Sequence, residues 1–379
     1  MKRIDNLTGV RAFAALWVVI YHTSGDVNFH AASPIVNRGW MGVDIFYVLS
    51  GLVLSLVYVR KLPAKFDWRW YRNFLSRRIA KIYPLHLITF ALSAALVVVA
   101  SHFHYEARNQ NENTLWSAIC NVLLLHSLGL TRLTGWNAPS WSVSAEWVAY
   151  SVMFAPMVFV LRRVRTAYVA ILTAILWISL ILLITLVLHC SLADLTTDGV
   201  LRIIPEFVGG YLLFRLVGTD GWKRGDLLTV AGIALVLLVA SFGRSGGWML
   251  LPAVMILLAG LYAGGKISDT LFGNRLMIML GDASYSIYLV QNLVFIGMHL
   301  VLRRRHIAEN VPIALLESAI VVMTGVVTFR YVEEPLRQRL LTVFKAKAPS
   351  DQKASLVHPK PAALDGTESN ASANAAIPK

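Results

Sequence analysis

Two side chains suited to anion binding and proton transfer lie on one face of the first apolar segment. Arg11 and His22 are eleven residues apart, which returns a helix to within about 20° of the same face over a rise of about 16 Å. A guanidinium binds phosphate through a fork of donors, and an imidazole exchanges a proton near neutral pH. Because a charge in mid-membrane costs about 2.5–3.5 kcal/mol, residues of this kind usually have a function. The alternatives are an interfacial anchor for Arg11 and a water-facing helix end for His22.

The most basic stretch of the chain runs from Tyr71 to Pro84. Arg78 and Lys81 are three residues apart and therefore share a helical face, and Arg77 lies next to them. This pattern predicts a phosphate site on the side of the membrane where the stretch lies. A positive-inside signal or a contact with anionic lipids is the alternative explanation.

A polar stripe enters the apolar segment that begins near residue 140. Ser142, Glu146 and Tyr150 are spaced by four residues, which places them on one side of a helix. A carboxylate within the membrane usually pairs with another group or takes part in the chemistry. Glu146 is therefore a candidate catalytic residue.

Three further polar features have simpler explanations. Asp44 begins an apolar segment, where it is either a helix N-terminal acid or a functional group. Arg202 and Glu206 are predicted to form an ion pair near a helix start. The hydroxyl and amide side chains from Ser284 to Gln291 are predicted to form hydrogen bonds between helices.

These residues are embedded in a chain that is too apolar for a water-soluble domain. Of its 379 residues, 56% are hydrophobic and 15% are charged, against about 25% charged residues in soluble domains. The mean hydropathy is +0.60, and a spanning helix needs about 20 apolar residues. We expect an all-α, polytopic membrane protein, a bundle of about ten transmembrane helices, with the first helix retained rather than cleaved. The candidate spans are residues 8–24, 39–59, 79–101, 140–161, 168–190, 200–217, 227–242, 247–264, 278–301 and 311–330.

The distribution of basic residues predicts the orientation of these spans. With a cytoplasmic N-terminus, the cytoplasmic segments contain 23 Lys and Arg residues and the outer segments contain seven. Segment 115–130 is predicted to be a re-entrant or surface helix, because an eleventh span would put one basic cluster outside. We therefore expect a transmembrane domain over residues 1–342 and a disordered, basic, cytoplasmic tail over residues 343–379.

The net charge of +14 does not indicate a nucleic-acid partner, because the basic residues are spread over the loops between spans. Cys120 and Cys190 lie far apart and have no metal-ligand spacing. No metal site is predicted.

Taken in order, these residues resemble the acyltransferase-3 family of bacterial membrane proteins over about residues 3 to 340. The common order of six blocks is more specific than any single block. Three positions depart from the family pattern: Lys81 where Arg is usual, Trp147 where many members have a second Glu, and Gln291 where His is common. The six blocks are Arg11-x10-His22, Gly42 to Gly51, Arg77-Arg78 to Pro84, Trp141 to Glu146, Ser284 to Leu289, and Glu333-Glu334-Pro335.

The resemblance implies an O-acyltransferase of the bacterial cytoplasmic (inner) membrane with both termini in the cytoplasm. Such a protein moves an acyl group, with acetyl the expected one, from cytoplasmic acyl-CoA to a hydroxyl of a cell-surface, exported or lipid-linked saccharide. No tightly bound cofactor is expected, and acyl-CoA is the co-substrate.

The resemblance also implies roles for individual residues. His22 is then the general base or an acyl relay. Glu146 is the expected partner of its imidazole in preference to Asp26 and Asp44, because Glu146 lies deeper in an apolar helix. The pantetheine arm of the donor would run along the bundle so that the thioester reaches His22. The predicted donor-phosphate ligands are Arg11, Arg77, Arg78 and Lys81, and the predicted substrate contacts are Asp44, Trp141, Ser142 and Tyr288.

A second class of function fits part of this pattern. Ten spans with intramembrane Arg, His and Glu would also suit a proton-coupled transporter of a small solute or glycolipid. Against it, no repeat relates the two halves of the chain, and the basic cytoplasmic face suits phosphate. Binding of acyl-CoA by the purified protein would favour the enzyme, and solute counterflow in proteoliposomes would favour the transporter.

Overall fold

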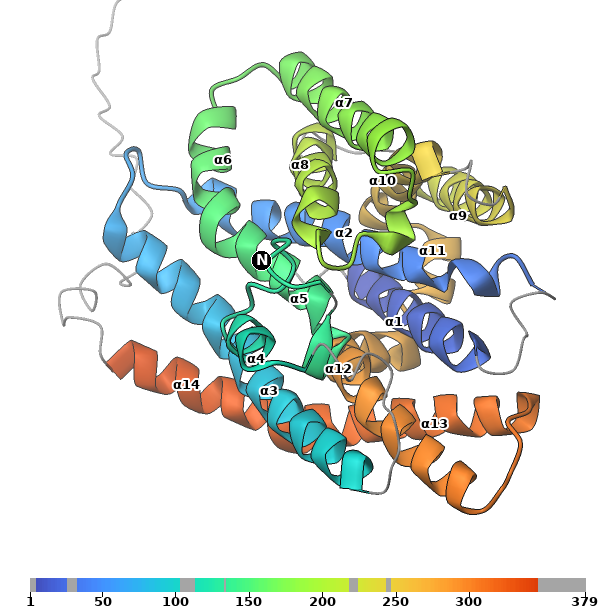
Figure 1. Ribbon diagram of the computed structural model, residues 1–379. Helices are drawn as coiled ribbons and strands as arrows, with labels where there is room; N and C mark the ends of the chain where they lie inside the picture. The colour runs from blue at the N-terminus through green and yellow to red at the C-terminus, as the bar shows by residue number, and fades with distance from the viewer. Residues whose placement is uncertain are drawn as a thin grey trace, which may run out of the picture.

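The computed structural model is all-helical over the part of the chain that it describes (Figure 1). The helices that occupy the ten predicted spans are α1 (Asp5–Gly25), α2 (Gly42–Tyr58), α3 (Trp68–His102), α5 (Ser140–Val148) with α6 (Phe154–Leu161), α7 (Thr166–Leu182), α8 (Gly199–Val217), α9 (Gly225–Ser241), α10 (Leu250–Ala263), α12 (Arg275–Arg304) and α13 (Val311–Thr328). The described residues are 5–25, 33–102, 113–132, 134–217, 224–242 and 247–346.

The lengths of these helices fit a membrane protein. The predicted all-α, polytopic fold is confirmed, because every predicted span is helical and six stretches could cross a membrane by length and composition. α9 and α10 are shorter, and α1 and α8 have 21 and 19 residues. Among the residues described, the six longer stretches are Val36–Lys61, Trp68–Val99, Ser140–Leu161, Thr166–Val187, Arg275–Arg304 and Val311–Phe344.

Two segments lie outside the spans. Segment 115–130 contains α4 (Leu115–Val122), which is about 12 Å long and ends in turns, so the prediction that it is not an eleventh span is confirmed. At the other end of the chain, α14 (Glu334–Ala346) packs beside α3 (Figure 1) and continues past the predicted domain boundary at residue 342. Residues 347–379 lie outside the described residues, so the disordered tail stays a prediction.

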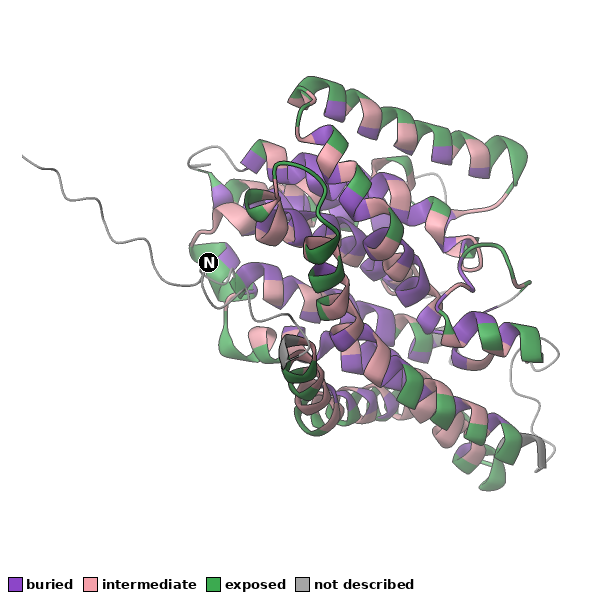
Figure 2. Ribbon diagram, turned by 90° about the vertical axis from the view of Figure 1, so that its left-hand side faces the viewer, coloured by how far each residue is buried: buried purple, intermediate pink, exposed green. Residues whose placement is uncertain are grey.

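Buried residues concentrate on the central helices and exposed residues on the periphery (Figure 2). α1 contacts α2, α12 and α13, and α2 packs along α8. The last pair can approach closely because glycines lie at the crossing: a Cβ atom at Gly51 would be 2.2 Å from the carbonyl oxygen of Phe207. α7 exposes Ile171, Ile175 and Ile178 at helical spacing, which suits a face toward lipid.

α1 and α12 run in the same direction with a constant offset. Near their first turns, a Cβ atom at Gly281 would be 2.0 Å from the carbonyl oxygen of Thr8. Fourteen residues further along each helix, the rings of His22 and Phe295 are 6.1 Å apart. α1 and α12 therefore lie side by side along the whole stretch of α1 from Arg11 to His22.

Candidate functional site

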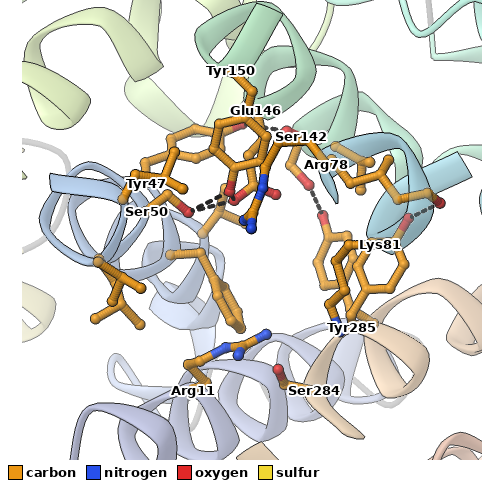
Figure 3. Close-up of a pocket in the computed structure, with 18 residues that line it drawn as sticks. Arg11, Tyr47, Ser50, Arg78, Lys81, Ser142, Glu146, Tyr150, Ser284 and Tyr285 are labelled. Carbon is orange, nitrogen blue, oxygen red and sulfur yellow. Dashed lines mark hydrogen bonds between the residues drawn. The ribbon is translucent and has the colours of Figure 1, made fainter. Parts of the chain in front are cut away.

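A cavity opens between α1, α2, α3, α5 and α12 and contains about 930 Å³ of empty space, including space open to its surroundings. Figure 3 shows its polar side chains converging from several helices. The ionisable side chains and hydroxyl groups that line it are Arg11, Tyr47, Ser50, Arg78, Lys81, Ser142, Glu146, Tyr150, Ser284, Tyr285 and Tyr288.

Arg78 is held in the cavity by aromatic rings rather than by a carboxylate. Its guanidinium carbon lies 5.7 Å from the ring centroid of Tyr58 and 5.8 Å from that of Tyr150. One terminal nitrogen donates to the hydroxyl of Tyr58 at 3.3 Å, and Nε has no hydrogen-bond partner among the described residues. Arg78 thus retains donor capacity and a charge that cation–π contacts orient without neutralising.

Lys81 reaches the same cavity one helical turn further along α3, as its spacing from Arg78 predicts. Its ammonium group forms an ion pair with Glu333, whose other carboxylate oxygen accepts from the hydroxyl of Ser286 at 2.6 Å. The ammonium also lies 5.5 Å from the ring centroid of Tyr285. Glu333 is 2% exposed, so it fixes the position of Lys81 from the protein interior.

The sequence analysis did not assign Glu333, although it quoted the block that contains it. A π-helical turn over Phe329–Glu333 changes the direction in which consecutive side chains point. Glu333, at the end of this turn, is buried, whereas Glu334 forms a partly exposed ion pair with Arg337. The signal available in the sequence was the pair of adjacent glutamates before Pro335, but sequence alone does not say which of them turns inward.

Glu146 lies in the cavity, where two hydroxyl groups donate to its Oε1 atom. The donors are Ser50 and Tyr150, and the Tyr150 hydroxyl also lies 3.0 Å from the Ser50 oxygen (Figure 3). Ser142, one turn before Glu146, donates to the hydroxyl of Tyr288 at 2.8 Å. The polar stripe predicted from the spacing of Ser142, Glu146 and Tyr150 therefore faces one cavity.

His22 lies near the end of α1, outside the lining of this cavity, and is exposed. Its ring contacts those of Tyr21 and Phe295. The structure thus brings Glu146 together with hydroxyls and cations and leaves His22 about 16 Å further along α1 than Arg11. Asp26, the competing partner for His22, lies outside the described residues. Arg77, a predicted phosphate ligand, is exposed and does not line the cavity.

Asp44 and Trp141, two predicted substrate contacts, surround a buried arginine instead of lining the cavity. Asp44 accepts from Nε and Nη2 of Arg202 at 2.7 and 2.5 Å, and both side chains are 1% exposed. The guanidinium carbon lies 5.6 Å from the ring centroid of Trp141. The predicted ion pair between Arg202 and Glu206 is therefore wrong, because Asp44, on another helix, offers the guanidinium a two-bond contact.

Arg11, Arg78 and Lys81 outnumber the two carboxylates, Glu146 and Glu333, that lie in or beside the cavity. The site is consequently positive, and part of its donor capacity is unused. It suits an anionic group with several oxygen acceptors, such as a phosphate.

Comparison with known proteins adds the chemistry. The profile of the family described as an acyltransferase domain matches residues 4–331. The chain belongs to this family. It is a membrane acyltransferase, which removes the transporter alternative.

Three relatives show how far the similarity extends. The chain is 25% identical to acyltransferase MdmB of Streptomyces mycarofaciens over 89% of this chain and 92% of that protein. It is 21% identical to O-acetyltransferase OatA of Staphylococcus aureus over 90% of this chain and 58% of that protein. It is 26% identical to the putative peptidoglycan O-acetyltransferase YrhL of Bacillus subtilis over 48% of this chain and 28% of that protein. No solved structure matched the chain.

Proposed function

We propose that this membrane acyltransferase takes an acyl group from cytoplasmic acyl-CoA and transfers it to a hydroxyl of a cell-surface or exported saccharide in the bacterial inner membrane. The observation that carries the proposal is the convergence of Arg11, Arg78 and Lys81 on one cavity. The acyl group proposed is acetyl, because two of the relatives are named O-acetyltransferases.

The positive charges of Arg11, Arg78 and Lys81 explain how this cavity would bind the donor. Coenzyme A carries several phosphate groups, and a cavity with an excess of positive charge over carboxylates attracts them. Arg78 offers the fork of donors that suits phosphate, and Lys81 supplies a point charge fixed by Glu333. The excess of basic residues in the segments on the same side of the membrane supports a cavity that opens toward the cytoplasm, where acyl-CoA is made.

His22 is the proposed general base, although it lies outside the cavity. In this proposal the arm of the bound donor extends along α1 from Arg11 toward His22, over a rise of about 16 Å. There the imidazole takes the proton of the acceptor hydroxyl, and the oxygen attacks the thioester carbonyl carbon. The carbon–sulfur bond breaks, the thiolate of coenzyme A leaves, and the imidazolium returns its proton to that sulfur.

The proposal is tested by separating donor binding from transfer in the purified protein and in membranes. Lys81→Met and Arg78→Ala should each raise the KM for acetyl-CoA about ten-fold or more, because a hydrogen bond to a charged group is worth about 1.5–3 kcal/mol. The KM for a thioester without phosphates should not change. His22→Ala should leave acetyl-CoA binding intact and lower acceptor acetylation by a factor of about 10² or more.

The control for the cations is Arg72→Ala, which removes an exposed arginine from the same helix at a position outside the cavity. Protein levels in the membrane are compared for every variant. Wild-type KM values for acetyl-CoA in both cavity variants, or full acetylation by His22→Ala, would refute the corresponding part of the proposal.

A further inference from the structure

A second cavity lies at the other end of α2 from Tyr58 and contains about 790 Å³ of empty space, including space open to its surroundings. Its walls come from the 3₁₀ helix η2 (Val36–Met41), from the π-helical turn η7 (Leu183–Val187) with the residues after it, and from the approach to α10. The residues that line it include Arg38, Trp40, Thr185, Cys190, Ser191 and Trp248.

This cavity is at the same end of the molecule as His22. η2 packs on the last turns of α1: a Cβ atom at Gly39 would be 2.2 Å from the carbonyl oxygen of Trp17 and 2.5 Å from Cβ of Tyr21. The indole nitrogen of Trp17 also donates to the carbonyl of Ile35 at 2.9 Å. The short helix η2 thus lies between Tyr21, the neighbour of His22, and the cavity. The distribution of basic residues predicts that this end of the bundle is outside the cytoplasm.

The walls of the cavity are held in place from behind by Arg202. Its Nη2 donates to the carbonyl of Trp40 at 3.3 Å and its Nη1 to that of Leu192 at 3.2 Å, while Asp44 neutralises its charge. The guanidinium carbon lies 5.0 Å from the ring centroid of Trp40. Because a buried ion pair fixes both wall segments, the shape of the cavity is defined before any ligand enters.

The side chains that line the cavity point to the chemistry of its ligand. Arg38 is half-buried, and its side chain forms no hydrogen bond or ion pair with the described residues. Its guanidinium is therefore available for a carboxylate or a phosphate. Trp40 and Trp248 add broad apolar rings with a polar edge, which suit the C–H face of a sugar ring. The hydroxyl of Ser191 donates to Asp194 at 2.6 Å, so it offers a ligand only its acceptor lone pairs.

We propose that this outer cavity binds the acceptor through a sugar unit that carries an anionic group, with Arg38 on the anion and Trp40 and Trp248 against the sugar. The inference rests on the proposed function, and it adds the class of acceptor and the place where it docks. The anion is a carboxylate of the sugar itself or the phosphate that links the sugar to a lipid, and both present the same oxygen acceptors to Arg38.

The two native cysteines make the cavity accessible to a direct test. Cys190 lines the cavity and is partly exposed, whereas Cys120 is buried, and neither forms a disulfide. A membrane-impermeant maleimide added to intact cells should label Cys190, and Cys190→Ala should remove that label. Purified protein is then labelled with the maleimide in the presence of one of three ligands: trigalacturonate, the neutral maltotriose, or a short prenyl phosphate.

An acidic ligand at about ten times its dissociation constant leaves about one site in eleven empty, so labelling should slow about ten-fold. Maltotriose at the same concentration should protect far less. Protection by trigalacturonate alone assigns the anion to the sugar, and protection by the prenyl phosphate alone assigns it to the lipid linkage. Arg38→Gln and Trp248→Ala should each abolish the protection, while Arg132→Gln, which changes an exposed arginine outside the cavity, should keep it.

Three results would each overturn the inference: labelling of Cys190 only from the cytoplasmic side, equal protection by all three compounds, or protection that survives Arg38→Gln. The KM for acetyl-CoA is measured on the same variants and should stay at the wild-type value. If the wild-type protein does not bind acetyl-CoA, the proposed function is refuted. If it binds acetyl-CoA but no ligand protects Cys190, only the acceptor site is refuted.

Discussion

The buried ion pair between Asp44 and Arg202 provides the sharpest test of how this membrane protein is held together. Asp44 accepts two hydrogen bonds from Arg202, at 2.7 and 2.5 Å, and each side chain is 1% exposed. Asp44→Asn keeps the shape of the side chain but removes the charge that balances the guanidinium. The substitution therefore leaves a buried cation whose hydrogen bonds to the carbonyls of Trp40 and Leu192 cannot neutralise it.

Removing one partner of a buried ion pair costs about 3–5 kcal/mol. The lower end of that range is expected here, because the carboxyl group of Glu206 also interacts with Asp44 and Arg202 and remains beside the guanidinium in the variant. A loss of about 3 kcal/mol lowers the folding equilibrium constant roughly a hundred-fold. Glu334→Gln breaks an ion pair whose side chains are about one-third exposed, and it should cost about 0–1 kcal/mol.

The measurement is the free energy of unfolding in detergent, followed by denaturant titration, with acceptor acetylation measured on the same samples. Asp44→Leu combined with Arg202→Leu should recover much of the stability, because replacing a buried pair by apolar side chains is often neutral. Normal stability of Asp44→Asn together with lost acetylation would refute this reasoning. It would instead support the sequence-based prediction that Asp44 contacts the substrate.

Two further predictions concern packing and pH. Gly51→Ala places a Cβ atom 2.2 Å from the carbonyl oxygen of Phe207 and should lower the free energy of unfolding by about 1–3 kcal/mol in a denaturant titration. Gly297→Ala is the control, because a Cβ atom there meets no neighbouring atom within 4 Å. Equal losses of stability in the two variants would contradict the close approach of α2 and α8. Burial lowers the pKa of His126, which lies 3.1 Å from the Ser140 hydroxyl, to about 4. The unfolded chain takes up a proton below about pH 6.5 and the folded protein does not until about pH 4, so stability should fall as the pH drops across that window. His126→Asn should flatten this pH dependence, and an unchanged slope would assign it to another group.

The sequence alone determined the features that depend on local periodicity. The apolar runs established the helices, because a segment of about 20 apolar residues has few stable alternatives in a membrane. The spacing of Arg78 and Lys81 placed both on one face of α3, and that of Ser142, Glu146 and Tyr150 made a stripe. All five line one cavity, because helical phase is a property of the chain within a few turns.

The tertiary structure decided which residues become partners across the bundle. Lys81 pairs with Glu333, 252 residues away, rather than with its neighbour Glu334. Arg202 bonds Asp44 on α2 rather than Glu206 on its own helix. Such choices follow from how helices cross and where glycines let them approach. Neither depends on spacing along the chain, which is why sequence reasoning found the charged residues of this acyltransferase but paired Arg202 wrongly.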